Sequence, residues 1–139
     1  MDARDGWHQP LRHVPSDELS PDTVQTPGMS RFEAISGRLS GSERIWLGRT
    51  HVAAGVSSAN HHHGESETGI YVVSGHPVFV FAGRHGEHRI EASPGDFVFV
   101  PPFTPHREEN PAADEEAVVV IARSTQEAIV VNLESLSEP

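Results

Sequence analysis

The stretch NHHHGESETGIYVV combines three consecutive histidines, His61, His62 and His63, with two carboxylates, Glu65 and Glu67. Alternate residues of a β-strand share a face, so His61 and His63 are expected to point one way and His62 the other. The same period would bring Glu65 and Glu67 to the side of His61, although the intervening glycine favours a bulge or bend that would interrupt it. Two imidazoles and a carboxylate on one face form part of a shell for a divalent transition metal. A surface loop of solvated histidines is the competing interpretation.

The overall composition excludes several classes of chemistry. The 139 residues suffice for one domain with a core, and 20 acidic against 10 basic residues give a formal charge of −10. A chain this acidic, with no basic cluster, is a poor match for nucleic acid or an anionic membrane, and we expect neither as a partner. Without cysteine it has no thiolate nucleophile, and without lysine it has no Schiff-base catalyst. The 10 histidines leave imidazole chemistry as the main candidate.

The beginning of the chain is expected to form an extended arm. Four prolines punctuate residues 1–28, and the apolar residues between them are too scattered to give a periodic face. The opening residues MDARDGWHQP lack the apolar core of a signal peptide, and no apolar run approaches the roughly 18 residues that span a bilayer. We therefore expect a cytoplasmic protein with an arm over 1–28 and one β-barrel domain over 29–139.

The domain itself is predicted to be all-β. Short runs rich in β-branched and aromatic residues alternate with clusters of Gly, Pro and Asn, as in SGHP, AGRHG and ASPGD. Strands of this length and spacing are typical of an antiparallel sandwich or barrel, and we predict a jelly-roll barrel. The expected strands are Arg44–Val52, Ile70–Val73, Pro77–Phe81, His88–Ala92, Phe97–Val100, Ala117–Ala122 and Ala128–Leu133.

A second stretch, GDFVFVPPFTPHREEN, places a further histidine, His106, after a strand and a proline-rich turn. Together the two stretches resemble the paired signature motifs of the cupin superfamily. The first motif, G-x5-H-x-H-x3-E followed by a glycine, is matched by Gly55, His61, His63, Glu67 and, one position late, Gly75. The second motif, G-x5-P-x-G-x2-H-x3-N, is matched by Gly95, Pro101, His106 and Asn110.

Phe103 departs from the second motif, because it stands where a glycine is usual. A glycine tolerates positive φ, so we expect the turn around Phe103 to take another shape. The late position of Gly75 lengthens a strand or turn and leaves the ligands alone. The run EEN that follows Arg107 is expected to be a solvated turn, although its asparagine belongs to the motif.

The resemblance implies a double-stranded β-helix in which His61, His63, Glu67 and His106 hold one metal ion. Three imidazoles and one carboxylate suit Zn, Fe, Mn, Ni or Co and disfavour Ca. Glu65 is the rival carboxylate: if the strand runs straight through the glycine, it points inward as a partner of a ligand or as a general base.

Aromatic side chains are expected to line the interior. Tyr71 continues the inward alternation from Glu67 and is a candidate to orient a substrate, with a structural tyrosine in the core as the alternative. Strand residues expected to lie mostly in the core, where the inward ones would wall the pocket, are Trp46, Phe79, Phe81, Phe97 and Phe99.

Three functions fit this chemistry. The resemblance favours a non-redox cyclase, isomerase or lyase that acts through a metal-stabilised enolate on an apolar or aromatic small molecule, as the cupin-type aromatic polyketide cyclases do. An Fe(II) dioxygenase and a non-catalytic ligand-binding or sensor protein are the alternatives, since one fold hosts many activities. Cupins commonly pair, so we also expect a homodimer, in which the arm adds a strand to the neighbouring subunit.

Overall fold

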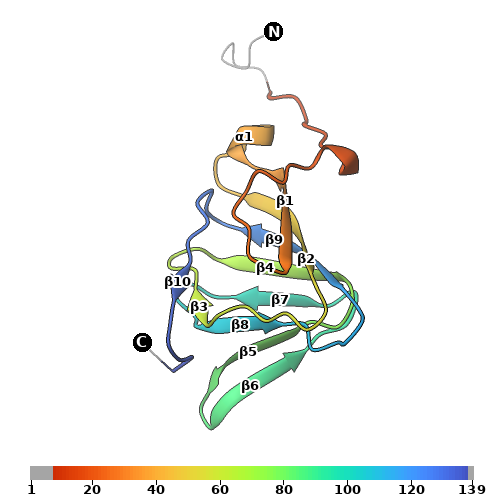
Figure 1. Ribbon diagram of the computed structural model, residues 1–139. Coiled ribbons are helices and arrows are strands. Elements are labelled where there is room, and N and C mark those ends of the chain that lie inside the picture. Colours follow the sequence, from red (N-terminus) through yellow and green to blue (C-terminus); the bar gives the residue numbers. More distant parts are fainter. Residues whose placement is uncertain (1–7, 138–139) are drawn as a thin grey trace.

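Two antiparallel five-stranded sheets face each other in the computed structural model, which describes residues 8–137 (Figure 1). One sheet has the strand order β1-β2-β9-β4-β7 and the other β10-β3-β8-β5-β6. The elements are a 3-10 turn (Ser16–Glu18), β1 (Met29–Ile35), α1 (Gly37–Ser40), β2 (Trp46–Val52), β3 (His61–His62), β4 (Thr68–Ser74), β5 (Val78–Gly83), β6 (Gly86–Glu91), β7 (Phe97–Val100), β8 (His106–Glu109), β9 (Ala117–Arg123) and β10 (Val131–Asn132). The predicted all-β jelly roll is therefore confirmed. Within residues 8–137 no helix is long and apolar enough to cross a membrane.

Alternating side chains build the core between the sheets. In β2, Trp46, Gly48, Thr50 and Val52 are buried, while Leu47, Arg49 and His51 between them are only partly covered. The main apolar cluster joins β4, β5, β7 and β9, and consists of Ile70, Val72, Phe79, Ala92, Val100 and Val119. Burial of these side chains stabilises the packing of the two sheets, and each large one contributes about 1.5–3 kcal/mol to the stability of the fold.

All seven predicted strands appear, six of them with shifted ends, and the short β3 and β8 as well as β1 were not among them. The prediction for β7 matches it to the residue, whereas Ala128–Leu133 shrinks to the two residues of β10. The sequence MSRFEAI, which forms β1, was not predicted as a strand because its arginine and glutamate obscure the apolar alternation. This strand pairs with β2 along most of its length and carries Met29, Arg31 and Glu33 on one face.

The region before β1 packs against its own chain. Ser20 and Glu33 exchange backbone hydrogen bonds of 2.9 and 2.7 Å, and Gln25 bonds both the amide and the carbonyl of Arg31 through its side chain. These contacts hold residues 20–26 against β1. Residues 1–7 of the predicted arm lie outside the described residues. Addition of a strand to a neighbouring subunit stays a prediction.

Some of the predicted core aromatic residues lie between the two sheets, and others lie on an outer face. Trp46 and Phe79 are buried, as predicted, but Phe97 and Phe99 are 79% and 60% exposed. Their expected place in the core is therefore wrong. In β7 the alternation sends Val98 and Val100 inward, so the two phenylalanines occupy the outer face of the edge strand.

Candidate metal centre

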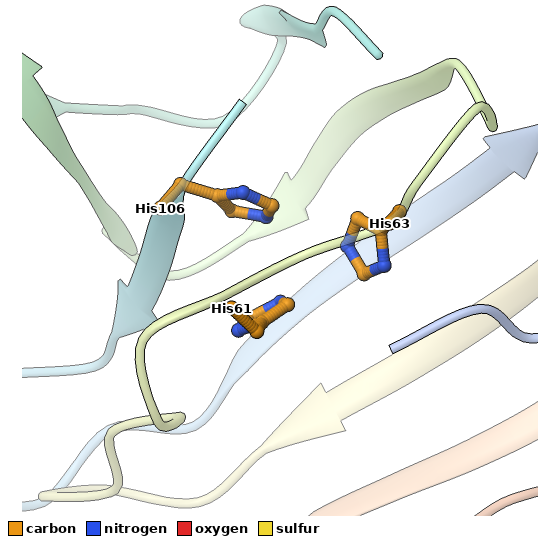
Figure 2. Close-up of side chains that lie close together, drawn as sticks. All are labelled: His61, His63 and His106. Carbon is orange, nitrogen blue, oxygen red and sulfur yellow. The ribbon is translucent and has the colours of Figure 1, made fainter. Parts of the chain in front are cut away.

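Three histidines, two in paired strands and one directly after β3, converge inside the barrel (Figure 2). His61 lies in β3 and pairs directly with His106 at the start of β8, while His63 directly follows β3. Their ring centroids are 4.8 Å (His61–His63), 4.5 Å (His61–His106) and 5.0 Å (His63–His106) apart. One potential ligand atom from each ring lies within 4.8 Å of the others, so a single metal ion can be shared among them.

Backbone carbonyls fix the tautomer of all three rings. The Nδ1 atoms of His61, His63 and His106 lie 2.7, 2.9 and 2.9 Å from the carbonyl oxygens of residues 59, 129 and 104. A carbonyl oxygen only accepts, so each Nδ1 must donate its proton. In the neutral ring Nε2 then keeps a lone pair for a metal. An Nδ1–H bonded to a backbone carbonyl is the usual support of a metal-binding histidine, and the donor set fits a divalent transition metal.

Burial keeps these rings neutral. Desolvation lowers the pKa of all three, and for His63 and His106 it does so to about 4, against a smaller opposing effect of the carbonyl hydrogen bonds. The neighbouring imidazoles lower these values further, since each disfavours a second positive charge. Neutral imidazole is the form that binds metal, so the site is prepared for a cation near neutral pH.

His62 belongs to a different environment, in agreement with the predicted alternation. Its Nδ1 accepts a hydrogen bond of 2.9 Å from the amide of Gly64, and its ring lies 5.8 Å from that of Phe103. An Nδ1 that accepts must be unprotonated, the opposite of the three converging rings. His62 therefore supports the turn after β3 and is not part of the metal-binding group.

The carboxylates do not join the histidines. Gly64 adopts φ +56°, and the amide of Ser66 bonds the carbonyl of His63 at 3.1 Å, which closes a turn between β3 and β4. This turn shifts the alternation by one residue. Ser66 and Thr68 are buried and line the cavity, whereas Glu65 and Glu67 are exposed.

The predicted inward direction of Glu65 and Glu67 is therefore wrong, for the reason that the glycine had signalled. Glu67 as a metal ligand, and Glu65 as a base, stay predictions that rest on the motif alone. In this part of the chain the hydroxyl-bearing Ser66 and Thr68, and not the carboxylates, line the cavity that the histidines also line.

The same shift places Tyr71 on the outer face of the sheet. The residue is 37% exposed, the centroid of its ring lies 4.8 Å from that of Phe97, and it is not among the residues that line the cavity. The prediction that Tyr71 points inward is wrong. Ile70 and Val72, its neighbours in β4, take the inward positions.

The two motif departures are accommodated differently from one another. Phe103 adopts φ +58°, the left-handed conformation in which a glycine was expected, and its amide bonds the carbonyl of Gly64 at 2.8 Å. The turn thus keeps its shape, contrary to expectation. Gly75 also has positive φ, and a Cβ there would lie 2.6 Å from the backbone of Ala117, so close packing against β9 requires a glycine.

The three histidines open into a cavity of about 410 Å³ that both sheets line. Its walls are largely apolar, and the large side chains among the lining residues are Met29, Trp46, Ile70, Phe79 and Ile121. Before β1, Thr23, Val24 and Thr26 complete one side of it. A concave, mostly apolar space with a few polar groups is typical of a small-molecule site.

Three charged residues that the sequence did not identify also line this cavity: Arg31, Glu108 and Arg123. Glu108 was expected in a solvated turn, but it lies in β8 two residues after His106 and therefore on the same face. Burial raises the pKa of its carboxyl to about 7, against the opposing charge of Arg31. The even spacing from His106 was the signal that would have revealed it. Arg31 was hidden because β1 itself was missed.

Comparison with known proteins agrees with this architecture. A family model described as a cupin domain matches residues 48–122, which is more than half of the chain. No curated protein matches the chain significantly.

Several solved structures share the fold. The polyketide cyclase RemF from Streptomyces resistomycificus has a TM-score of 0.73 at 22% identity, over 93% of this chain and 89% of that one. KdgF from Halomonas sp. has a TM-score of 0.68 at 19% identity, over 85% and 96%. Oxalate decarboxylase from Lactobacillus farciminis, in a formate complex, reaches 0.68 at 20% identity, over 84% of this chain and 34% of the other. At these identities the likeness establishes the fold.

Proposed function

The chain belongs to the cupin domain family, and on this premise we propose that it is a metal-dependent enzyme that transforms a small molecule without redox chemistry. The observation that carries the proposal is the convergence of His61, His63 and His106, three neutral imidazoles held by carbonyls, at an apolar cavity. These three residues would hold the ion. A divalent metal bound there would act as a Lewis acid, polarising a carbonyl oxygen of the substrate and stabilising negative charge that develops on it.

The chain's own residues supply the binding site. The apolar walls around Trp46, Phe79 and Ile121 displace water from the substrate, which strengthens electrostatic interactions at the reacting end. The hydroxyl groups of Thr50 and Thr68, both buried and facing the cavity, are placed to donate hydrogen bonds to substrate oxygens.

The size and lining of the cavity support an apolar or aromatic substrate. A volume of about 410 Å³ falls in the range of small-molecule sites, and aromatic side chains stack on flat ring systems. Similarity to the fold of a polyketide cyclase is consistent with a cyclase, isomerase or lyase that acts on an enolisable carbonyl. The identity of the metal is left to measurement, since Zn, Fe, Mn, Ni and Co all accept imidazole.

The test requires no knowledge of the natural substrate. Purified protein is analysed for bound metals, loaded with each candidate ion, and incubated anaerobically in D2O with benzoylacetone, an aromatic 1,3-diketone. NMR then follows exchange of the hydrogens between the two carbonyls. We expect metal-loaded protein to accelerate this exchange over the same ion in buffer, and His61→Ala to lose the acceleration.

Two results would contradict the proposal. If the hydrogens exchange no faster with the protein than with free metal, the proposed enolisation is contradicted. Consumption of oxygen with a ketone substrate under air, without anaerobic exchange, would instead support the dioxygenase.

We also propose that the protein forms a homodimer. Tyr71, Val73, Phe97 and Phe99 make an apolar outer face on β4 and β7, with exposed fractions of 37, 46, 79 and 60%. Side chains of this kind, gathered on one face, are typical of a protein–protein interface.

A further inference from the structure

Arg31 places a cation inside the cavity, and no carboxylate of residues 8–137 forms an ion pair with it. Its guanidinium donates a hydrogen bond of 2.8 Å to Oγ1 of Thr26 and lies 3.8 Å from the sulfur of Met29. Since a guanidinium offers five N–H donors, one hydroxyl and one weak thioether acceptor leave most of them available to a ligand.

Arg123, the second arginine at the cavity, is used differently. Its Nε and Nη2 donate to the carbonyl oxygens of Thr125 and Gln126 at 3.0 and 2.7 Å, and its guanidinium stacks 3.9 Å above the ring of Trp46. These contacts fix the loop after β9. They leave Arg31 as the better candidate for contact with a ligand.

The charge in the cavity is opposite to that of the chain. Two guanidiniums and one carboxyl, that of Glu108, line the same space in a protein whose formal charge is −10. Glu108 attracts Arg31 electrostatically but forms no ion pair with it, so one carboxyl faces two guanidiniums in this space. A partly buried cation without a direct ion pair gains stability when an anionic partner contacts it.

We propose that the cavity binds a substrate whose apolar body carries a carboxylate, and that the guanidinium of Arg31 holds this carboxylate while the remainder of the molecule reaches the histidines. A planar guanidinium matches a carboxylate in two parallel hydrogen bonds, which orients the ligand as well as attracting it. The apolar walls accept the hydrocarbon part. This inference deepens the proposed function, because it rests on the cavity being the substrate site.

The experiment compares two probes of almost equal shape, 2-naphthoate and its neutral amide, 2-naphthamide, by isothermal titration calorimetry. The full chain is used both metal-free, after dialysis against a chelator, and loaded with zinc. In the metal-free protein the carboxylate has no ion to bind, so any preference for it comes from the protein. We expect 2-naphthoate to bind at least about tenfold more tightly than the amide, as a hydrogen bond to a charged group provides.

Three variants locate the effect. Arg31→Gln should remove the preference, and Arg31→Lys should keep part of it, because the charge remains while the fork is lost. Arg84→Gln is the control: it changes the net charge equally, but Arg84 is exposed in the turn between β5 and β6. Circular dichroism confirms that each variant is folded.

Equal binding of the two probes to the parent protein overturns the proposal. Failure of 2-naphthoate to bind overturns it as well. A folded Arg31→Gln that keeps the preference overturns it as well. Because the preference is judged in the metal-free protein, this result is independent of the exchange assay. A failed exchange assay with an intact preference would refute only the metal chemistry, and the reverse result would refute only the carboxylate site.

Discussion

The three adjacent histidines provide an internal test of the metal centre, because His62 lies between His61 and His63 in the sequence but its side chain points the other way. The test compares the free energy of unfolding with and without zinc in the parent, His61→Ala, His62→Ala and His106→Ala. Binding to the native state alone stabilises it by RT ln(1 + [Zn]/Kd), about 2.7 kcal/mol when the free zinc concentration is 100 times Kd. This increment in the free energy of unfolding, and not the stability of the metal-free protein, shows which histidines bind the metal.

The structure predicts both parts of the measurement. Without metal, each variant loses one hydrogen bond made by an imidazole, to a carbonyl for His61 and His106 and to the amide of Gly64 for His62, so each should be less stable by about 1 kcal/mol. With metal they should diverge. If loss of one ligand raises Kd about 100-fold, the increment for His61→Ala and His106→Ala falls to about 0.4 kcal/mol at the same zinc concentration.

His62→Ala should retain the full increment of about 2.7 kcal/mol on its lowered baseline. The assay is urea denaturation followed by tryptophan fluorescence, with bound metal per chain measured by mass spectrometry after identical purification. A His62 variant that loses its increment while His61→Ala keeps it would refute the register of β3, and with it the metal centre. Equal increments in all four proteins would place zinc elsewhere.

Three further predictions concern the turn chemistry, the carboxylates and assembly. Gly55→Ala should lower the free energy of unfolding by about 1–2 kcal/mol, because of its positive φ alone. Gly75→Ala should lower it by about 1–3 kcal/mol more, because its Cβ would meet the backbone of β9, and equal urea midpoints for the two variants would refute this. From their exposed positions we expect Glu65→Gln and Glu67→Gln to keep the parent's metal content in mass spectrometry, and a loss confined to Glu67→Gln would restore the carboxylate as a fourth ligand. Phe97→Glu should convert the dimer to a monomer in light scattering, and an unchanged mass would exclude this face as the interface.

Strand alternation predicts short-range geometry well and fails across turns. His61 and His63 are two residues apart within one extended segment, so their shared face followed from the period alone. Tyr71 lies beyond the turn that Gly64 forms, and a shift of one residue in that turn reverses the face of every later side chain. The backbone conformation of a turn depends on contacts that the local sequence does not contain, here the amide of Phe103 on the carbonyl of Gly64.

The remaining parts of the site come from elements far apart in the chain. His106 joins the group only because β8 pairs with β3, a contact that the motif resemblance supplied and that no local pattern could. Arg31 reaches the cavity because β1 pairs with β2 and is held by the residues before it. The sequence of β1 is rich in polar residues, and such a strand is recognised only when the strands that it pairs with are known.

The charge of the site connects the outward direction of Glu67 to the choice of substrate. With Glu67 exposed, three neutral imidazoles would leave both positive charges of a bound divalent ion uncompensated by its ligands. Arg31 and Arg123 add to this positive potential, and Glu108 is the one carboxyl among the described residues that line the cavity. A neutral substrate would leave this excess in place at low dielectric, where it costs most. On the proposed function, an anionic substrate would reduce it by binding, and negative charge developing on the substrate oxygen nearest the histidines would reduce it further. For the proposed Lewis-acid chemistry on a carbonyl, this arrangement would favour a transition state more negative at the histidines than the ground state.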